Sequence, residues 1–463
     1  MNMPQGVVDI PAVIDASPLS RFQIAILILV GLTVVIDGFD VQAMGFVAPA
    51  IIQAWGVNKA AFGPIFGAGL LGMLLGSLSL SVVADKLGRR PVLIGATLAF
   101  ALCTLATSQV RTMSELLAIR FVTGLGLGAI MPNAMALAAE FSQKRKRVTL
   151  MMWVSCGFTI GAVLGGLISA ALIPALGWQS VFILGGIVPL ILTVLMALYM
   201  PESMVFSVMR GVRFERVAQA LHCIDPTLVV TSDTQFVVAH MSRDKAPVAG
   251  LFRDGRAKTT LLLWVINFMN LLNLYFLSNW LPTIARSAGL STATSVLVGT
   301  VLQLGGVVGT VVMGPLIDRV GFFKVLVPAF LVAAVTIAAI GQSGLSLAML
   351  LGVVSVTGFT IIGGQPALNA LAATYYPTSL RSTGVGWSLG IGRIGSIVGP
   401  VIGGELIRLG LSNGSLFLAV AVPAVLSASM LVLVAKARRH ADASRGLATH
   451  RTDDGMGGNI AGE

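Results

Sequence analysis

Charged residues are scarce in this sequence. Asp, Glu, Lys and Arg make up 11% of its 463 residues, whereas hydrophobic residues make up 56% and the mean hydropathy is +0.91. A soluble protein carries about a quarter charged residues, so the composition excludes an ordinary soluble protein. The apolar runs are about 20 residues long, which is typical of membrane-spanning helices and not of the roughly 10-residue alternating strands of an outer-membrane barrel.

Cysteine and histidine are also rare. The three cysteines, Cys103, Cys156 and Cys223, are scattered without CxxC spacing, and none of the four histidines lies in an apolar run. These spacings support neither a disulfide framework nor a metal site. No HExxH motif or Cys/His constellation indicates an enzyme, and we expect no cofactor. A proton carrier within the membrane would therefore have to be a carboxylate.

Twelve apolar runs form two groups of six and predict an all-α membrane protein with two six-helix bundles. Arg210, Arg213 and Arg216 alternate with apolar residues between the groups, which predicts a short amphipathic helix followed by a flexible linker. The predicted organisation is an N-terminal segment (1–21), an N-terminal bundle (22–200), a central loop (201–258), a C-terminal bundle (259–435) and a tail (436–463).

The basic residues predict the orientation in the membrane. Lys59, Arg111, Arg286 and Arg408 fall at one set of loops or helix ends, and nearly all other Lys and Arg residues outside the apolar runs lie on the opposite side. The positive-inside rule makes that opposite side cytoplasmic, with both termini inside. The net charge of +11 is thus a topology signal and not evidence for nucleic-acid binding. We expect a multi-pass protein of the cell inner membrane that functions as a monomer in the lipid bilayer.

The two halves repeat each other in sequence. When the second half is aligned on the first at a constant offset, Asp37 matches Asn270 and Asp40 matches Asn273. After a single inserted residue in the second half, a series of glycines and Trp153 continue the alignment. Six helices per half give both halves the same orientation. Parallel repeats of this kind are typical of transporters that move one bundle against the other around a midplane site.

The first apolar run contains Asp37 and Asp40, which share one helix face. A carboxylate at that depth costs at least about 2.5–3.5 kcal/mol and marks a functional site by default. Burial and mutual repulsion favour one retained proton, so the pair is a candidate proton-binding element. A structural pair that braces neighbouring helices is the alternative.

A second motif is duplicated at matching loops. Asp85 is followed by Arg89 and Arg90 after the second run, and Asp318 is followed by Arg319 after the eighth. An aspartate beside a helix end with basic neighbours can form a latch between bundles. A plain hydrophilic turn is the alternative, but the duplication favours the latch.

These motifs resemble the major facilitator superfamily. The first loop matches the pattern G-x-x-x-D-[RK]-x-G-R-[RK] except that Ser81 replaces the leading glycine. The segments Asp37–Asp40, Met44–Pro49, Arg120–Gly128 and Gly390–Arg393 are similar to those of aromatic acid/proton symporters of the 4-hydroxybenzoate and protocatechuate type. The resemblance implies the major facilitator fold and functional roles at eight residues: Asp37, Asp40, Asp85, Arg120, Glu140, Asp318, Arg381 and Arg393.

Two arginines within apolar runs are candidate binding groups. Arg393 lies near the middle of its helix, and a guanidinium fork suits a substrate carboxylate. Arg120 lies closer in depth to Asp40 and is expected to pair with it when substrate is absent. A structural bridge is the alternative for each arginine. Further candidates that could complete a pocket in the C-terminal half are Asn270, Asn273, Tyr275, Gln303, Gln365, Asn369 and Trp387. Packing is an equal alternative for Trp387, because it aligns with Trp153.

We therefore predict a proton-coupled symporter that imports small aromatic carboxylates such as hydroxybenzoates by alternating access. A drug or organic-anion antiporter of the same fold is the first alternative. A sensor that binds aromatic acids without moving them is the second. The sequence leaves the identity of the acid and the proton stoichiometry open.

Overall fold

The computed structural model describes residues 7–211, 214–228, 234–238, 248–342, 344–377 and 379–456, with the backbone alone over 438–456. Within these residues, twelve helices are long and apolar enough to cross a membrane, as the sequence predicts. The first six are α2 (Arg21–Trp55), α3 (Phe62–Leu87), α4 (Arg89–Thr107), α5 (Met113–Glu140), α6 (Arg147–Leu176) and α7 (Gln179–Tyr199). The second six are α10 (Ala257–Ser287), α11 (Thr292–Val320), α12 (Phe322–Ile340), α13 (Leu347–Tyr375), α14 (Arg381–Arg408) and α15 (Asn413–Met456).

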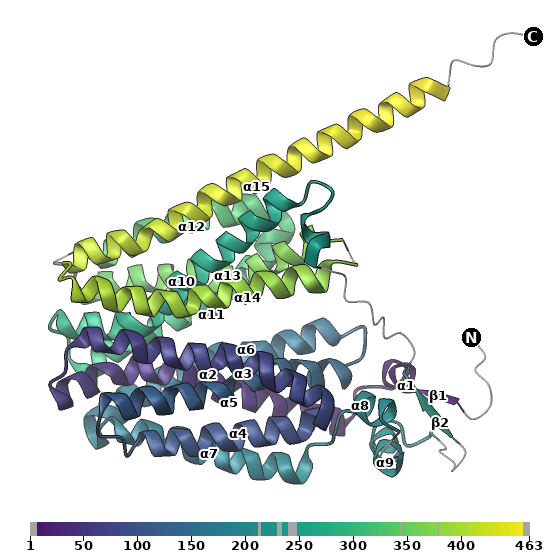
Figure 1. Ribbon diagram of the computed structural model, residues 1–463, viewed down its shortest axis with the longest axis horizontal. Coiled ribbons are helices and arrows are strands. Elements are labelled where there is room, and N and C mark those ends of the chain that lie inside the picture. The colour runs from purple at the N-terminus through teal and green to yellow at the C-terminus, as the bar shows by residue number, and fades with distance from the viewer. Residues whose placement is uncertain are drawn as a thin grey trace, which may run out of the picture.

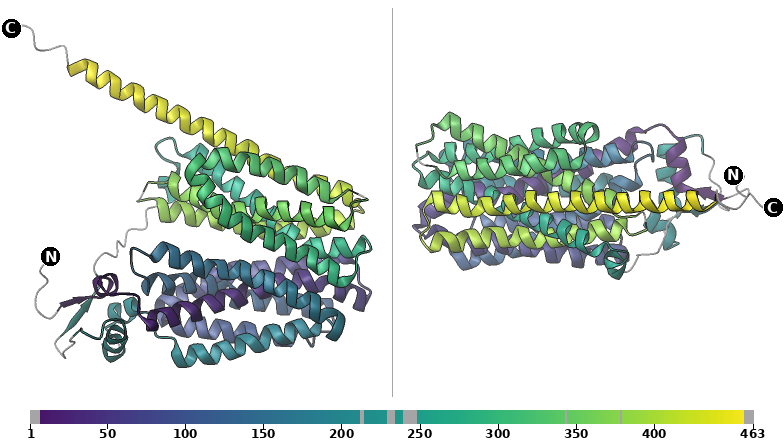
Figure 2. Two further views of the ribbon diagram at one scale, coloured as in Figure 1. Left: turned by 180° about the vertical axis from the view of Figure 1, so that it is seen from behind. Right: turned by 90° about the horizontal axis from the view of Figure 1, so that it is seen from above.

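The helices form two bundles that lie side by side (Figure 1). Helix bounds repeat between them, because α4 and α12 begin at the aligned residues Arg89 and Phe322, and α6 and α14 begin at the aligned residues Arg147 and Arg381. The predicted duplication is thus confirmed at the level of whole helices. α15 continues along the same axis beyond its bundle, past the predicted boundary at residue 435 (Figure 2).

A small folded region at the end of the N-terminal bundle combines parts of the N-terminal segment and of the central loop, and part of the predicted flexible linker lies outside the described residues. This region contains β1 (Val7–Asp9), α1 (Ile10–Ala16), α8 (Met204–Met209), α9 (Phe214–Ile224) and β2 (Gln235–Val237), while the 3-10 helix η2 (Val248–Phe252) precedes α10. β1 and β2 pair in parallel, which the sequence analysis did not predict. The backbone N–H of Lys144 donates to Asp15 and attaches this region to the loop between α5 and α6. The predicted amphipathic helix is present as α9, although Arg213 lies outside the described residues.

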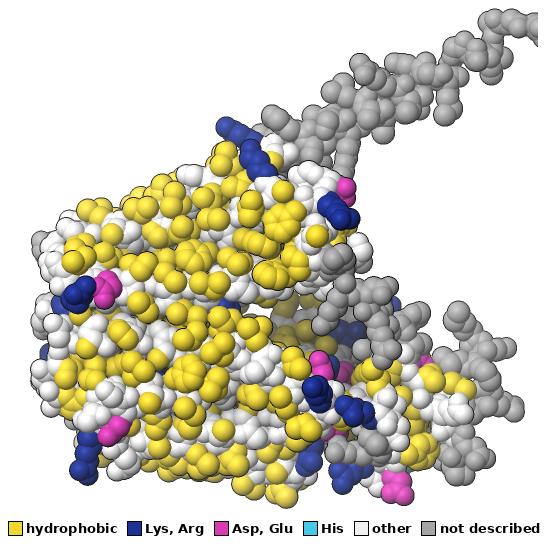
Figure 3. All heavy atoms as spheres, viewed as in Figure 1, with side chains coloured by type: hydrophobic (Ala, Val, Ile, Leu, Met, Phe, Trp, Pro, Cys, Tyr) yellow, Lys and Arg dark blue, Asp and Glu magenta, His cyan; other side chains and the backbone are white. Residues whose placement is uncertain are grey.

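The flanks of both bundles are apolar, and charged side chains gather near the ends of the helices (Figure 3). The aligned tryptophans follow this pattern, since Trp153 is 74% exposed and Trp387 is 44% exposed. Such large exposed apolar side chains are stable in lipid but not in water. The surface is therefore that of a protein embedded in a bilayer.

The bundles meet closely at one end only. There, a Cβ on Gly45 would lie 2.7 Å from the carbonyl oxygen of Ser278, and a Cβ on Gly404 would lie 3.0 Å from Cα of Gly63. We call this the closed end; it holds the C-terminal ends of α2, α10 and α14. The opposite end carries both termini and a hollow between the bundles (Figure 3). We call it the open end, and it is the face that the basic residues predict to be cytoplasmic.

A short 3-10 helix, η1 (Lys59–Ala61), lies at the closed end between α2 and α3. Asn58 caps it by accepting from the backbone N–H of Ala60. The carbonyl oxygen of Ala60 lies where a Cβ on Gly404 would approach it to 3.0 Å. Backbone therefore packs on backbone across the bundle interface, which requires glycine on at least one side.

Candidate functional site

Asp40 forms a buried ion pair within the N-terminal bundle. Its Oδ2 lies 3.1 Å from NH1 of Arg120 on α5, and its Oδ1 accepts a hydrogen bond of 2.9 Å from the hydroxyl of Thr104 on α4. The geometry of the 3.1 Å contact does not meet the criteria for a hydrogen bond, so Asp40 Oδ2 and Arg120 NH1 interact as an ion pair only. The pairing expected between Asp40 and Arg120 is present. Thr104 was missed, because a single threonine in an apolar run carries no signal by itself.

Asp37, one turn earlier on α2, has a different environment. Its side chain is fully buried, and neither carboxyl oxygen has a hydrogen-bond partner among the described residues. The charges that act on it are those of Arg393, from α14 in the other bundle, and of Asp40. A buried carboxyl without hydrogen bonds is costly as an isolated anion, so its protonation state depends on those neighbouring charges.

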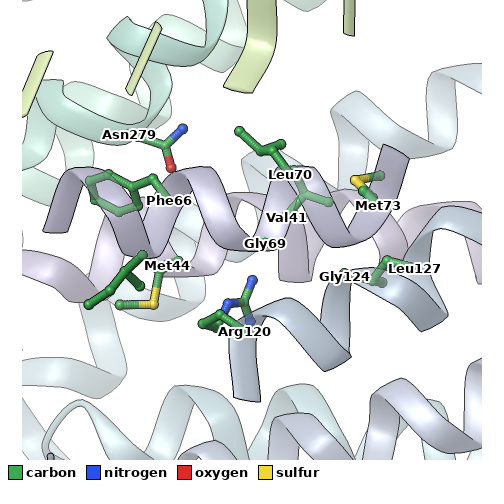
Figure 4. A pocket seen from close by; sticks show the side chains of 11 residues that line it. Val41, Met44, Phe66, Gly69, Leu70, Met73, Arg120, Gly124, Leu127 and Asn279 are labelled. Atoms are coloured by element: carbon green, nitrogen blue, oxygen red, sulfur yellow. The ribbon is translucent and has the colours of Figure 1, made fainter. Parts of the chain in front are cut away.

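Arg393 lies at the boundary between the bundles. Its NH1 is 3.8 Å from Sδ of Met73 on α3, and its charge also reaches the buried phenol of Tyr275 on α10. Met73 and Arg120 both line a small cavity between α2, α3, α5 and α10 (Figure 4). The cavity has a volume of about 20 Å³, enough for about one water molecule. Its lining is mainly apolar, with Phe66, Met44 and Leu70 around the guanidinium of Arg120.

An amide network occupies the matching place in the C-terminal bundle. Asn270 Nδ2 donates to Gln365 Oε1 at 2.7 Å, and Gln365 Nε2 donates to Asn369 Oδ1 at 3.1 Å and to Asn267 Oδ1 at 3.0 Å. Asn267 in turn donates to the hydroxyl of Ser388 at 2.7 Å. The structure thus brings together three of the predicted residues. Sequence reasoning missed Asn267, although an asparagine one helical turn before Asn270 was a usable signal, and it missed Ser388, which gave none.

Three other predicted binding residues lie apart from this network. Gln303 donates to the hydroxyl of Ser278 at 3.0 Å near the closed end. Trp387 stacks on Trp264, with ring centroids 5.7 Å apart and planes inclined by 20°. Asn273 is fully buried and neither of its amide atoms has a partner among the described residues.

The predicted gating residues all lie at the open end. Arg89 forms an ion pair with Glu140, which ties the start of α4 to the end of α5. Arg90 donates through Nε to the carbonyl oxygen of Met200 at 2.7 Å and so binds the end of α7. The remaining four are exposed to solvent: Asp85, Asp318, Arg319 and Arg381. No ion pair between the bundles is present at the open end among the described residues, so the residues predicted to form a latch are not paired across the bundles in this structure.

Comparison with known proteins agrees with this geometry. The sequence profile of the Major Facilitator Superfamily matches residues 30–216 and 263–452, which correspond to the two bundles. The chain belongs to the Major Facilitator Superfamily. Its members are transporters, so the prediction of a transporter and not an enzyme is confirmed.

Relatives within the superfamily resemble the chain over nearly their whole length. It is 41% identical to the 4-hydroxybenzoate transporter PcaK of Pseudomonas aeruginosa, over 94% of this chain and 97% of that one. It is 40% identical to the gallate transporter of Pseudomonas putida, over 94% and 96%. It is 34% identical to the 3-(3-hydroxy-phenyl)propionate transporter of Escherichia coli, over 88% and 93%.

Two solved structures share the fold. The first is a bacterial homolog of the human lysosomal transporter Spinster in an inward-facing, unoccupied conformation, with a TM-score of 0.71 and 16% identity over 90% of this chain and 97% of that one. The second is the D-xylose-proton symporter, with a TM-score of 0.69 and 15% identity over 89% and 97%. These similarities confirm the two-bundle major facilitator fold.

Proposed function

We propose that this protein imports small aromatic carboxylates into the cytoplasm together with protons. The observation that carries the proposal is the electrostatic interaction of Asp37 on α2 with Arg393 on α14, across the interface between the bundles. A buried carboxyl without hydrogen bonds lies within electrostatic range of a guanidinium from the other bundle. The full-length similarity to transporters named for 4-hydroxybenzoate and gallate supports the aromatic acid as substrate.

Arg393 is the residue that would bind the carboxylate of the substrate. It has no carboxylate partner among the described residues, and its NH1 contacts the sulfur of Met73 at 3.8 Å. Arg120, by contrast, is occupied by Asp40 at 3.1 Å. A planar guanidinium can accept a carboxylate in two parallel hydrogen bonds, so Arg393 supplies both charge and orientation.

Asp37 would carry the proton. While Arg393 has no substrate, its positive charge favours ionised Asp37; once a substrate anion neutralises Arg393, the charge of Asp37 loses this compensation. Protonation of Asp37 then removes a repulsive charge from the site, and loss of that proton promotes release. Coupling is thus a difference in substrate affinity between two protonation states, since equal affinity would shift nothing.

The rest of the site would recognise the aromatic ring and its substituents. The amide network of Asn270, Gln365 and Asn369 offers donors and acceptors for ring hydroxyls, and Tyr275 offers an aromatic face. The small volume of the cavity beside Arg120 requires the bundles to move when a ring enters. Asn273, Gln303 and Trp387 remain candidates for substrate contact, and replacing each of them by alanine tests that contact.

Alternating access would use the two ends of the bundle interface. With the open end in the cytoplasm, the structure is the state from which substrate is released inside. Closing that end would bring Asp85 and Asp318 toward basic residues of the opposite bundle, and the Arg89–Glu140 pair would keep the latch loop in register. The cell inner membrane and a functional monomer are part of the same proposal.

The test is a paired measurement of uptake and counterflow in proteoliposomes. Asp37→Asn imitates the protonated carboxyl, so we expect exchange of labelled 4-hydroxybenzoate to survive while accumulation driven by a pH gradient is lost. Asp254→Asn, at an exposed position 76% accessible in its side chain, is the matched control and should behave like the unaltered protein.

The same assay separates the alternative functions. If Asp37→Asn still concentrates the acid against its gradient with an unchanged pH dependence, Asp37 is not the proton site. Accumulation that is opposed by an inward proton gradient would indicate an antiporter. Binding without any counterflow would indicate a sensor.

A further inference from the structure

A second cavity lies at the open end, outside the transport path. It has a volume of about 460 Å³ and lies between the start of α4, the end of α7 and the short helices α8 and α9. All of these elements belong to the N-terminal bundle or to the central loop, so the cavity does not depend on contact between the bundles. None of the residues assigned to substrate or proton binding lines it.

The cavity has two basic side chains at its wall. Arg90 is held in place because Nε and NH2 donate to the carbonyl oxygens of Met200 and Ala197, at 2.7 and 2.5 Å, which leaves NH1 free to bind a ligand. Arg216, on α9, is exposed and has no hydrogen-bond or ion-pair partner among the described residues. A fixed guanidinium and an unpartnered one that line the same cavity are groups that bind phosphate oxygens.

The acidic residue in the cavity is already used by the protein. Glu202 is 8% exposed, and its Oε1 accepts from the backbone N–H groups of Arg90 and Ser203, both at 3.0 Å. Its carboxylate therefore stabilises the first turn of α4. With Glu202 ionised, the two arginines still leave the lining of the cavity with a net positive charge.

The position of the cavity identifies the source of the phosphate. α7 ends here, and Leu198 and Tyr199, which line the cavity, are 68% and 66% exposed on the flank of the bundle. Tyrosine at a helix end marks the membrane interface, where lipid headgroups lie. The amphipathic helix α9 closes the cavity from the other side, with Val217, Ala220 and Leu221 buried beneath it. One end of the cavity is thus open to lipid and the other is basic.

We propose that this cavity binds the headgroup of an anionic phospholipid. The phosphate would lie between Arg90 and Arg216, and the acyl chains would pass along Leu198 and Tyr199. Arg90 directly follows Arg89, the partner of Glu140, so a bound lipid would hold the latch loop and α9 against the N-terminal bundle. The bound lipid would thus stabilise the open end of the N-terminal bundle.

Cys223 provides a built-in reporter, because it is exposed and lines the cavity. In the Cys156→Ser variant it is the one exposed cysteine among the described residues. The measurement is the rate of maleimide labelling of Cys223 in the purified full chain in an uncharged detergent. Phosphatidylglycerol, phosphatidylcholine or inorganic phosphate is then added at increasing concentration.

We expect phosphatidylglycerol to slow the labelling and phosphatidylcholine to leave it unchanged. Arg216→Gln should raise the phosphatidylglycerol concentration needed for half-maximal protection by about fivefold, the effect of one basic residue near an anionic surface. Gln219→Arg, which adds a positive charge to the lining, should lower it by a similar factor. Lys436→Gln, an exposed lysine near the open end of the other bundle, is the matched control and should change nothing.

Any one of four results would overturn the proposal. Equal protection by phosphatidylcholine would show that the cavity takes any lipid. Equal protection by inorganic phosphate would show a free-anion site. A loss of protection in Lys436→Gln as large as that in Arg216→Gln would show that the lipid is attracted by the overall positive charge of the protein and not by this cavity. If Arg216→Gln alters the labelling rate in the absence of lipid, its effect on lipid binding cannot be read from this assay, and Gln219→Arg is used instead. If Gln219→Arg does not lower the phosphatidylglycerol concentration needed for half-maximal protection, the site is rejected.

Discussion

The two bundles have the same helices but different chemistry at equivalent positions. In the N-terminal bundle, Asp40 is ion-paired with Arg120 and hydrogen-bonded to Thr104. The corresponding residues in the C-terminal bundle are Asn273, Val354 and Ile337, of which Asn273 has no hydrogen-bond partner among the described residues. Conversely, Arg393 corresponds to Thr159. The two halves thus share their helix packing but not their buried charges. The acids lie in the N-terminal bundle, and the guanidinium without a carboxylate partner among the described residues lies in the C-terminal bundle.

This division has a physical advantage for a carrier. Two charges on the same bundle keep their distance when the bundles rock, whereas charges on opposite bundles change their interaction with every cycle. Asp40 and Arg120 lie within one bundle and can remain paired throughout. Asp37 and Arg393 lie on different bundles, so their interaction can depend on the conformation and on the ligand between them.

The ends of the bundles differ in the same way. Arg89 and Glu140 form an ion pair in the N-terminal bundle, and the corresponding residues, Phe322 and Thr374, cannot. At the closed end, Gly404 on α14 corresponds to Ala170 on α6. Aligned positions in the two bundles therefore have different steric and electrostatic requirements. Replacing a residue by the one at the aligned position of the other bundle tests this difference.

The largest effect is expected from giving the N-terminal bundle the chemistry of its counterpart. Asp40→Asn leaves Arg120 buried without a compensating charge, which should cost about 3–5 kcal/mol in the free energy of unfolding and abolish uptake. The double variant Asp40→Asn/Arg120→Val reproduces the pair Asn273/Val354 and should recover much of the stability but not the uptake. Thermal unfolding in detergent and uptake in proteoliposomes measure the two properties.

A double variant as unstable as Asp40→Asn alone would contradict this view. It would mean that the instability comes from the asparagine and not from the unpaired guanidinium. Recovery of uptake in the double variant would show that the Asp40–Arg120 pair only braces the helices.

A smaller effect is expected at the free guanidinium of the other bundle. Arg393→Lys keeps the charge but loses the planar fork, so binding of 4-hydroxybenzoate should weaken by about tenfold or more, as for a lost charge-assisted hydrogen bond. Binding of the corresponding amide should change much less. Calorimetric titration of both ligands makes the comparison, and equal weakening for acid and amide would assign Arg393 a structural role.

The smallest effect concerns the closed end. A Cβ on Gly404 would approach Cα of Gly63 and the carbonyl oxygen of Ala60, each to 3.0 Å. Gly404→Ala should therefore cost about 1–3 kcal/mol in the closed state and slow counterflow by about tenfold. The reverse change at the equivalent position, Ala170→Gly, should alter the rate little. Equal slowing in both variants would show that the effect comes from helix propensity and not from contact between the bundles.

Much of this protein follows from the sequence alone. Twelve apolar runs, their arrangement as six and six and the constant offset between the halves determined the two-bundle fold, because a bilayer allows few structures other than helices of this length. The polar residues within those runs identified Asp37, Asp40, Arg120 and Arg393, since ionisable groups at such depth are costly unless they function.

Only the tertiary structure decided how those residues divide their roles. Asp37 and Asp40 lie one turn apart on α2 and cannot be told apart from the sequence. In the structure, Asp37 has no hydrogen-bond partner among the described residues, whereas Asp40 contacts Thr104 of α4 and Arg120 of α5. The strand pairing of β1 with β2 and the cavity behind α9 each join segments that lie far apart along the chain. Local sequence patterns carry no information on such contacts, since the partners meet only after the helices have packed.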